Sequence, residues 1–255
     1  MPPLWQAKAE QTADLWRQAR FPIALTGAGI SVASGIPDFR SPDGLWTRHD
    51  PAEVATLDAL HSRPDKVWDL VYDIMLVLER AKPNPAHTAL AELEAGGRLK
   101  AIITQNIDSL HQQAGSRNVV EFHGSGRRFY CMGCHEEYDP AGVRSLTRDD
   151  LPWTCGMCQR VIRPDFVFFG ERIPEEPMGE SMRLMELADL CLVVGTSGEV
   201  APANTLPYRI KASGGRVVEI NLGPSIFGEL PDVRFDAPAE EVLPSLARLV
   251  LQSSS

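Results

Sequence analysis

Four cysteines in two Cys-x-x-Cys pairs are the feature that most constrains how this chain can fold. The first pair is Cys131 and Cys134, and the second is Cys155 and Cys158. Each pair fits a tight turn that points two thiolates at one ion, and two such turns complete the tetrahedral shell that zinc prefers. Because sulfur fills all four positions, the predicted zinc is structural and holds together residues 127–163, a segment too small to have its own core. The alternative is four free thiols or a redox pair.

Composition and charge limit the class of protein. The 255 residues are 44% hydrophobic and 23% charged, as in a globular protein with one large domain and an insertion, or with two smaller domains. The formal charge of -9 gives no positive field for nucleic acid or membrane, and it permits a basic partner such as a lysine-bearing peptide. The N-terminus does not resemble a signal peptide, and no apolar run reaches the ~20 residues of a membrane span. We therefore expect a cytoplasmic protein, whose reducing surroundings favour metal ligation over disulfides, and a buried core thiol at Cys191.

Predicted strands and helices alternate along most of the chain. Strands are expected at 23–26, 100–104, 165–169, 190–194 and 216–221, and helices at 4–20, from Pro64, from Pro85, at 180–187, from Pro202 and from about Ala239. Asn84 is expected to cap the helix from Pro85. This rhythm predicts an α/β fold, a Rossmann-like parallel sheet with helices on both faces. The helix from Pro64 carries an apolar stripe that is either a packing face or the lining of an apolar channel.

Polar residues gather where two predicted strands end, within the stretch 102–124. The first strand ends on Thr104, Gln105, Asn106 and Asp108, and the second leads to His123. In an open parallel sheet the carboxyl ends of strands form the crevice where ligands bind. The sequence therefore predicts a catalytic site with His123 as its proton-transfer group. A structural histidine, and helix caps at Asn106 and Asp108, are the alternatives.

A glycine-rich turn follows the strand at 23–26. Gly27, Ala28, Gly29 and Ser31 begin the next element, where small residues let the backbone approach a ligand and free N–H groups favour a phosphate. The third glycine of the dinucleotide fingerprint comes late, at Gly35, so the turn fits a tight loop as well as a cofactor site. The loop at 35–46 then brackets Asp38, Phe39 and Arg40 with prolines and glycines, which predicts a mobile lid or a plain surface loop.

Several motifs, in a fixed order, resemble those of the sirtuins, the NAD-dependent protein lysine deacylases. They are GAGIS (27–31), GIPDFR (35–40), TQNID (104–108), EFHG (121–124), the four cysteines, PDFVFFGE (164–171), GTS (195–197) and INLG (220–223). The resemblance extends from Phe21 to the C-terminal helix, which is nearly the whole chain.

The resemblance implies roles for the matching residues. Those that would bind NAD are Gly27, Ala28, Gly29 and Ser31 at the phosphates, Asp38, Phe39 and Arg40 in the cofactor loop, Gln105, Asn106, Ile107 and Asp108 around the nicotinamide and its ribose, and Gly195, Thr196, Ser197, Asn221, Leu222, Gly223 and Ala239 along the adenosine half. His123 would be the general base that takes a proton from a ribose hydroxyl, with Asn106 and Asp108 beside it in the catalytic set. The residues expected to bind the substrate peptide as an added strand are Val167, Phe168, Phe169, Gly170 and Glu171.

Two departures from the family pattern bear on the substrate. Sirtuins that prefer succinyl- or malonyl-lysine carry a Tyr-x-x-Arg pair on the helix lining the acyl pocket, and Val71 and Ile74 stand at those positions here. Apolar residues cannot bind a carboxylate, so an uncharged acyl group is expected. After GTS, Gly198 and Glu199 replace a bulkier apolar residue, which affects the contacts of the substrate strand.

The resemblance implies an NAD-binding domain made of residues 1–36, 82–126 and 164–255, with a helical insertion at 37–81 and the zinc module at 127–163. It implies removal of acetyl, or longer uncharged acyl, groups from protein lysines, which gives nicotinamide and O-acyl-ADP-ribose. The expected partners are NAD, structural zinc and acylated lysine in peptides, without nucleic acid or membrane, and the chain is expected to be a monomer. The alternatives are a mono-ADP-ribosyltransferase and a non-catalytic NAD-sensing module.

Overall fold

The computed structural model describes residues 5–38 and 50–252, and it confirms the predicted parallel sheet. Six strands lie in the order β3-β2-β1-β7-β8-β9, and every neighbouring pair is parallel. Their bounds are β1 Pro22–Thr26, β2 Ala101–Thr104, β3 Val119–Glu121, β7 Leu190–Val194, β8 Arg216–Ile220 and β9 Val233–Phe235. All residues of β1, β2 and β7 are buried, as expected for strands covered on both faces.

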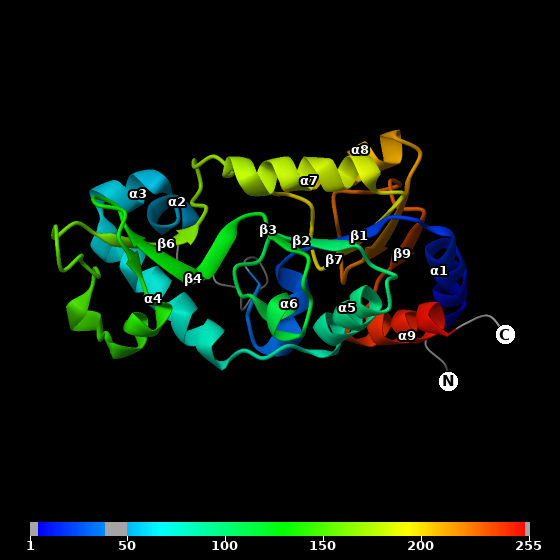
Figure 1. Ribbon diagram of the computed structural model, residues 1–255, viewed down its shortest axis with the longest axis horizontal. Helices are drawn as coiled ribbons and strands as arrows, with labels where there is room; N and C mark the ends of the chain where they lie inside the picture. The colour runs from blue at the N-terminus through cyan, green and yellow to red at the C-terminus, as the bar shows by residue number, and fades with distance from the viewer. Residues whose placement is uncertain (1–4, 39–49, 253–255) are drawn as a thin grey trace.

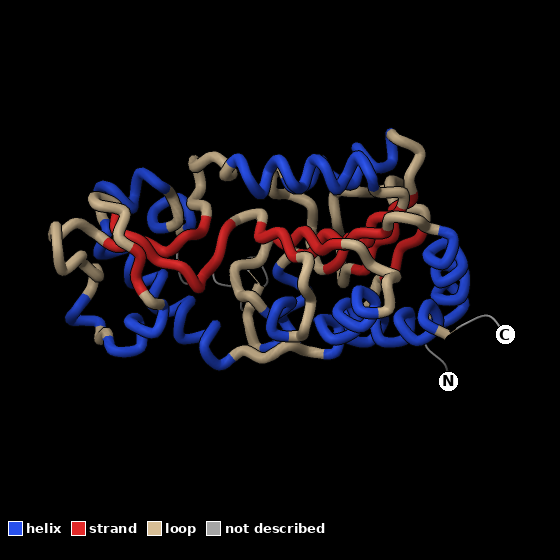
Figure 2. Tube along the Cα trace, in the orientation of Figure 1, coloured by secondary structure: helices blue, strands red, loops and turns tan. Residues whose placement is uncertain are grey.

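Helices cover both faces of this sheet (Figures 1 and 2). On one face lie α1 (Gln6–Gln18), α5 (Pro85–Ala95) and α9 (Ala239–Leu251), and on the other lie α7 (Glu175–Leu187) and α8 (Leu206–Ala212). Alternate residues of β1 serve the two layers: Ala24 packs in the same cluster as Trp16, whereas Ile23 and Leu25 pack with Leu184. The N-terminus of α5 confirms the predicted cap, because the Asn84 side chain accepts a hydrogen bond from the backbone N–H of Ala86 (2.9 Å).

A smaller lobe lies beyond the β3 edge of the sheet (left in Figure 1). It contains α2 (Pro51–Val54), α3 (Leu57–Ser62), α4 (Pro64–Arg80) and an antiparallel sheet in the order β5-β4-β6. These strands are β4 Gly124–Cys131, β5 Glu137–Tyr138 and β6 Ile162–Phe166, and the 3₁₀ helices η3 (Pro140–Ser145) and η4 (Arg148–Asp150) lie beside them.

One predicted strand was placed wrongly. The strand expected at 165–169 as part of the parallel series is β6, which begins at Ile162 and pairs antiparallel with β4 in the small sheet. The cause is that the chain turns back through the zinc module after β4, so β6 returns beside β4 and not beside the large sheet. Three further strands, β4, the two-residue β5 and the three-residue β9, were not expected from the sequence.

The core of the small lobe is centred on Trp68 of α4. Its side chain is fully buried between Phe129 and Trp153, with ring centroids 6.2 and 6.1 Å away. The indole Nε1–H donates to the backbone carbonyl of Ile162 (2.9 Å), so the helix is tied to β6. Arg148 adds exposed ion pairs to Asp69 and Asp73 on the same helix. Within 5–38 and 50–252, no helix has the length and apolar character needed to cross a membrane.

Trp68→Phe should lower the free energy of unfolding by about 1–3 kcal/mol, because the buried Ile162 carbonyl loses its donor while most of the ring packing is kept. The measurement is the midpoint of urea denaturation followed by circular dichroism. Leu76→Ala, on the more exposed side of the same helix, is the control and should change the midpoint far less. An equal effect of the two variants would contradict the role given to this hydrogen bond.

Candidate active site

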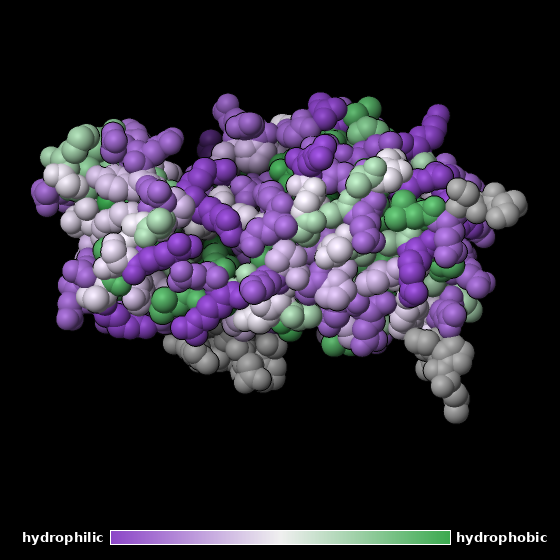
Figure 3. Space-filling model, turned by 60° about the horizontal axis from the view of Figure 1, so that its bottom comes forward, coloured by the Kyte–Doolittle hydropathy of each residue, from purple (hydrophilic) through white to green (hydrophobic). Residues whose placement is uncertain are grey.

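A cavity of about 1260 Å³ lies between the carboxyl edge of the large sheet and the small lobe. Seen from below, apolar surface is visible between hydrophilic rims where the lobes meet (Figure 3). The structure brings most of the sequence-predicted site residues to its wall: Gly27, Ala28, Gly29, Ser31, Asp38, Ile74, Gln105, Asn106, Ile107, Asp108, His123, Val167, Phe168, Phe169, Gly170, Glu171, Gly195, Thr196, Ser197, Asn221, Leu222 and Ala239. Val71 and Gly223 are not part of the wall, and Phe39 and Arg40 lie outside the described residues.

Two backbone turns meet at the centre of the sheet edge. The N–H of Gly29, at the start of the 3₁₀ helix η1 (Ala28–Ser34), donates to the carbonyl of Gly195 after β7 (2.8 Å). A Cβ added at Gly29 would lie 2.8 Å from the Cα of Gly195, and one added at Gly195 would lie 2.2 Å from the backbone nitrogen of Ile30. Glycine is therefore required at both positions. The late third glycine, Gly35, has φ +83 and ends the 3₁₀ helix.

A buried polar cluster lies directly behind the glycine turn. Ser31 Oγ donates to Asp108 Oδ2 (2.7 Å), and the backbone N–H of Leu110 donates to Asp108 Oδ1 (2.9 Å). Asn106 Nδ2 donates to the carbonyl of Gly27 (3.1 Å) and to Ser31 Oγ (3.2 Å). Burial raises the pKa of Asp108, although the hydrogen bonds from Leu110 and Ser31 act against it. The bond from Leu110 ties the Asp108 side chain to the first residue of α6 (Leu110–Gln113), although the N-cap residue of this helix is Ser109.

His123 holds its ring in one tautomer. Its Nδ1 lies 3.1 Å from the backbone carbonyl of Gln105, which can only accept, so Nδ1 carries the proton. Nε2 then has a free lone pair and makes no hydrogen bond within the described residues. Burial lowers the pKa of His123, opposed by the hydrogen bond to Gln105, and so favours the neutral ring.

Two more histidines lie beneath the polar cluster, with ring centroids 4.9 Å apart. His87 Nδ1 accepts from the backbone N–H of Asn84 (3.3 Å), and His111 Nε2 lies 2.9 Å from Thr26 Oγ1. Burial lowers the pKa of His87 to about 4, and burial together with His87 lowers that of His111 to about 3. Both rings are therefore neutral at pH 7. The sequence reading did not single out either residue, because its strand-end argument does not extend to helices behind the sheet.

One wall of the cavity is formed by residues 167–170. The segment pairs with its neighbours as far as Phe169 and then turns at Gly170 (φ +85), where the N–H of Glu171 donates to the carbonyl of Phe168 (3.0 Å). The backbone N–H of Val167 donates to the carbonyl of His123 (2.9 Å), and Phe169 pairs through both backbone groups with Ala55 and Leu57 (2.8 and 3.1 Å). Across the cavity, Gly198 has φ +77, and a Cβ there would lie 2.7 Å from the ring of Phe227. This crowding explains the glycine that departs from the family pattern, and Glu199 follows it as an exposed residue of the wall.

The apolar end of the cavity is lined by Leu70, Ile74 and Leu78 of α4, with Ile107 opposite. Val71 is turned into the core of the small lobe beside Trp68. Leu70, Ile74 and Leu78 belong to the apolar stripe predicted for the helix from Pro64, and their spacing i, i+4, i+8 places them on one helix face. This part of the stripe lines the cavity, whereas Val71 packs inward.

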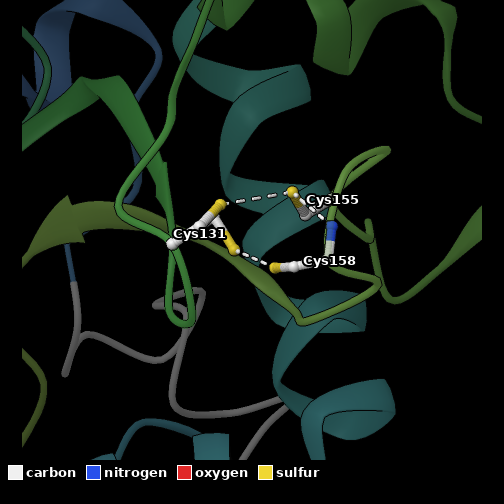
Figure 4. Close-up of side chains that lie close together, drawn as sticks. Cys131, Cys155 and Cys158 are labelled. Atoms are coloured by element: carbon white, nitrogen blue, oxygen red, sulfur yellow. Dashed lines mark hydrogen bonds between the residues drawn. The ribbon is translucent and has the colours of Figure 1, made fainter.

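The four module cysteines converge on one point. Their Sγ atoms all lie within 4.8 Å of one another, with Cys131–Cys158 at 3.3 Å and Cys134–Cys155 at 3.6 Å, and none is in a disulfide (Figure 4). Zinc bonded at about 2.3 Å to four sulfurs spaces them by a little under 4 Å, so the cluster fits this ion. Tyr138 Oη donates to Cys155 Sγ (3.1 Å), which orients a ligand as in other metal sites. The fifth cysteine, Cys191, is buried in β7 as predicted.

The Sir2 family model matches residues 27–202 of this sequence, which is more than half of the chain. The chain belongs to the Sir2 family. Among its relatives, an NAD-dependent protein deacylase of Thermococcus kodakarensis is 48% identical, over 93% of this chain and 94% of the relative. An NAD-dependent protein deacetylase of Pyrobaculum aerophilum is 44% identical, over 93% and 92%.

Solved Sir2 structures share the fold. A Sir2 homologue in complex with NAD has a TM-score of 0.88 and 41% identity, and covers 94% of this chain and 93% of its own. A Sir2 protein with a p53 peptide and NAD+ has a TM-score of 0.84 and 36% identity, over 93% and 96%. The predicted family, fold class and four-cysteine cluster are therefore confirmed.

This Sir2 protein should lose stability as the pH falls from about 6.5 to about 4. A histidine in the unfolded chain titrates near ~6.5, whereas the folded pKa values of His87 and His111 are about 4 and about 3. The unfolded state then binds more protons in this window, so stability is full above it and declines below it. Urea midpoints at pH 7, 5.5 and 4.5 measure the effect.

His111→Gln keeps a donor toward Thr26 but cannot take up a proton, so its urea midpoint should depend less on pH than that of the wild type. His61→Gln, at an exposed position in α3, is the matched control and should keep the wild-type dependence. Parallel pH curves for His111→Gln and the wild type would show that this buried histidine is not responsible.

Proposed function

We propose that this protein is an NAD-dependent protein lysine deacylase that removes acetyl and longer uncharged acyl groups. The observation that carries the proposal is one cavity that joins the glycine turn, the Ser31–Asp108 cluster and the free nitrogen of His123 to an extended wall and an apolar end. Relatives named as deacylases and deacetylases, 43–48% identical over most of the chain, support the same activity.

NAD would lie along the carboxyl edge of the large sheet. The backbone of the turn at Gly27–Gly29 would lie close to the phosphates, because glycine leaves no side chain in the way. The N–H groups of Gly27 and Gly29 donate to the carbonyls of Val194 and Gly195, so the N–H of Ala28, which has no partner among the described residues, would be the one directed to a phosphate. Asn106 and Asp108 would hold the nicotinamide end, and the adenosine half would lie along residues 195–197, 221–223 and Ala239. When bound, NAD supplies a ribose C1′ that transfers to the acyl oxygen as nicotinamide leaves.

His123 would act as the general base. Its Nδ1–H is held by the carbonyl of Gln105, so the lone pair of Nε2 is available to a ribose hydroxyl. The buried neutral ring needs no prior loss of a proton at pH 7. Overall, acyl-lysine, NAD and water give free lysine, nicotinamide and O-acyl-ADP-ribose, with positioning and water exclusion by the surrounding wall.

The substrate peptide would add a strand along residues 167–170, through the carbonyl of Val167 and the backbone groups of Gly170, which have no partner among the described residues. Its acyl chain would be directed to Leu70, Ile74 and Leu78. This end has no described cation on α4 facing it, so an acyl carboxylate would be buried unpaired. The domain division into 1–36, 82–126 and 164–255, with 37–81 and 127–163 as insertions, is part of this proposal. The position of α2, α3 and α4 in the small lobe supports it, although its boundaries at 126 and 164 cross β4 and β6. The monomeric state stays a prediction, and four thiol ligands without a disulfide support a cytoplasmic setting.

The test is mass spectrometry of products from acetyl-, succinyl- and myristoyl-lysine peptides incubated with NAD and zinc-loaded protein. We expect nicotinamide and O-acyl-ADP-ribose from acetyl and myristoyl peptides, and a succinyl rate at least about tenfold lower. Preferential succinyl removal would contradict the apolar acyl site. ADP-ribose retained on protein, without O-acyl-ADP-ribose, would contradict deacylation itself.

His123→Ala should lower the rate of acetyl-peptide turnover by about 10²–10⁴-fold, the usual contribution of a general base, while NAD binding is kept. In the wild type, the acid limb of the kcat/KM profile should lie below pH 6.5, because burial lowers the pKa of His123. A limb above pH 6.5, or full activity of His123→Ala, would remove His123 from the mechanism.

A further inference from the structure

Glu171 ends the extended wall, but its carboxylate is turned back into the small lobe. Both of its oxygens bind the guanidinium of Arg163, at 2.6 Å (Nη1–Oε1) and 2.9 Å (Nη2–Oε2). The side chains are 6% and 22% exposed, so this two-point ion pair is largely shielded from water.

The same pair holds the backbone of the segment between its two members. Arg163 Nη2 also donates to the carbonyl of Phe166 (2.8 Å), and Nε donates to that of Pro164 (3.1 Å). Glu171 Oε2 accepts from the backbone N–H of Phe168 (2.9 Å). The guanidinium carbon lies 5.0 Å from the centroid of the Phe168 ring, on whose face it packs. One buried ion pair thus fixes backbone groups at three points between residues 164 and 168.

We propose that the Arg163–Glu171 pair is a positioning device, which fixes residues 167–170, including the turn at Gly170, in the conformation that would bind the main chain of the substrate. Neither side chain needs to touch the substrate. The proposal rests on the proposed function, since it assigns the wall to peptide binding. It also changes the expected role of Glu171 from a substrate contact to a support behind the wall.

The alternative is that the pair serves general stability. Both residues lie within one stretch, 163–171, and their bonds close that stretch on itself. Loss of the hydrogen bonds within 163–171 should loosen this segment alone, because the hydrophobic clusters of the two lobes keep their packing. The predicted signature is therefore a defect in peptide binding with little change in NAD binding or unfolding.

The experiment is steady-state kinetics of Glu171→Gln with acetyl-peptide and NAD varied separately. Glutamine keeps the size and an acceptor for Phe168 N–H, but it removes the charge that Arg163 binds. We expect the KM for peptide to rise about tenfold, as for loss of a charged hydrogen bond, while kcat and the KM for NAD stay within about twofold. Arg163→Lys, which keeps the charge and loses the two-point geometry, should show an intermediate rise.

Glu180→Gln is the matched control, because Glu180 also binds an arginine, Arg183, at two points (2.8 and 2.6 Å) on the exposed surface of α7. It should leave all kinetic constants unchanged. An unchanged peptide KM in Glu171→Gln, or an equal rise for peptide and NAD, would overturn the proposal. So would a large fall in unfolding midpoint accompanied by loss of every activity.

Failure of the proposed function gives a different result. In that case the wild type releases no nicotinamide from any acyl-peptide. The affinity of wild type and Glu171→Gln for a fluorescein-labelled acetyl-peptide, measured by anisotropy, then decides the role of the pair. Weaker binding by the variant supports it, and equal affinity or no binding by the wild type rejects it.

Discussion

The close approach of two backbone turns, at Gly29 and Gly195, is the constraint on which the rest of the site depends. The turns follow β1 and β7, neighbouring strands at the centre of the sheet, and their N–H to carbonyl distance of 2.8 Å leaves no room for a Cβ on either side. Ser31 is placed against Asp108 because η1 begins at this contact, and Asn106 reaches back to the Gly27 carbonyl across the same gap. A side chain at either glycine would separate β1 from β7 and disperse the cluster.

Burial sets the protonation states around that contact. His87, His111 and His123 are all shifted toward the neutral ring, and in each case burial is the largest cause. The carbonyl of Gln105 and the N–H of Asn84 then select opposite tautomers for His123 and His87. His123 therefore has a free lone pair on Nε2, whereas His87 accepts a hydrogen bond at Nδ1. The difference comes from their backbone partners.

The features that were predicted correctly from the sequence are those that a few adjacent residues determine. The Cys-x-x-Cys pairs, the Asn84 cap and the strand Leu190–Val194 are each fixed by a few adjacent residues, and all are present. The sheet to which β6 belongs depends on the path through the zinc module, and no residue within the strand encodes it. The sequence also left open which residues of the apolar stripe on α4 pack inward and which line a cavity. Only the packing of Trp68 against Phe129 turns Val71 inward and leaves Ile74 at the cavity.

The net charge of the chain and the few cations around the cavity constrain how it can bind both proposed ligands, NAD and a lysine-bearing peptide. The chain carries a formal charge of -9, and among the described residues that line the cavity Arg172 is the sole lysine or arginine. An anionic dinucleotide would therefore depend on close approach to the backbone of the glycine turn, where the N–H of Ala28 has no partner among the described residues. A lysine-bearing peptide is positively charged, so the negative electrostatic field of the whole chain attracts it. The carboxylate of Glu171 is paired with Arg163, so the attraction of the peptide does not depend on a carboxylate in the wall. The wall can then bind the peptide through its backbone and accept many sequences.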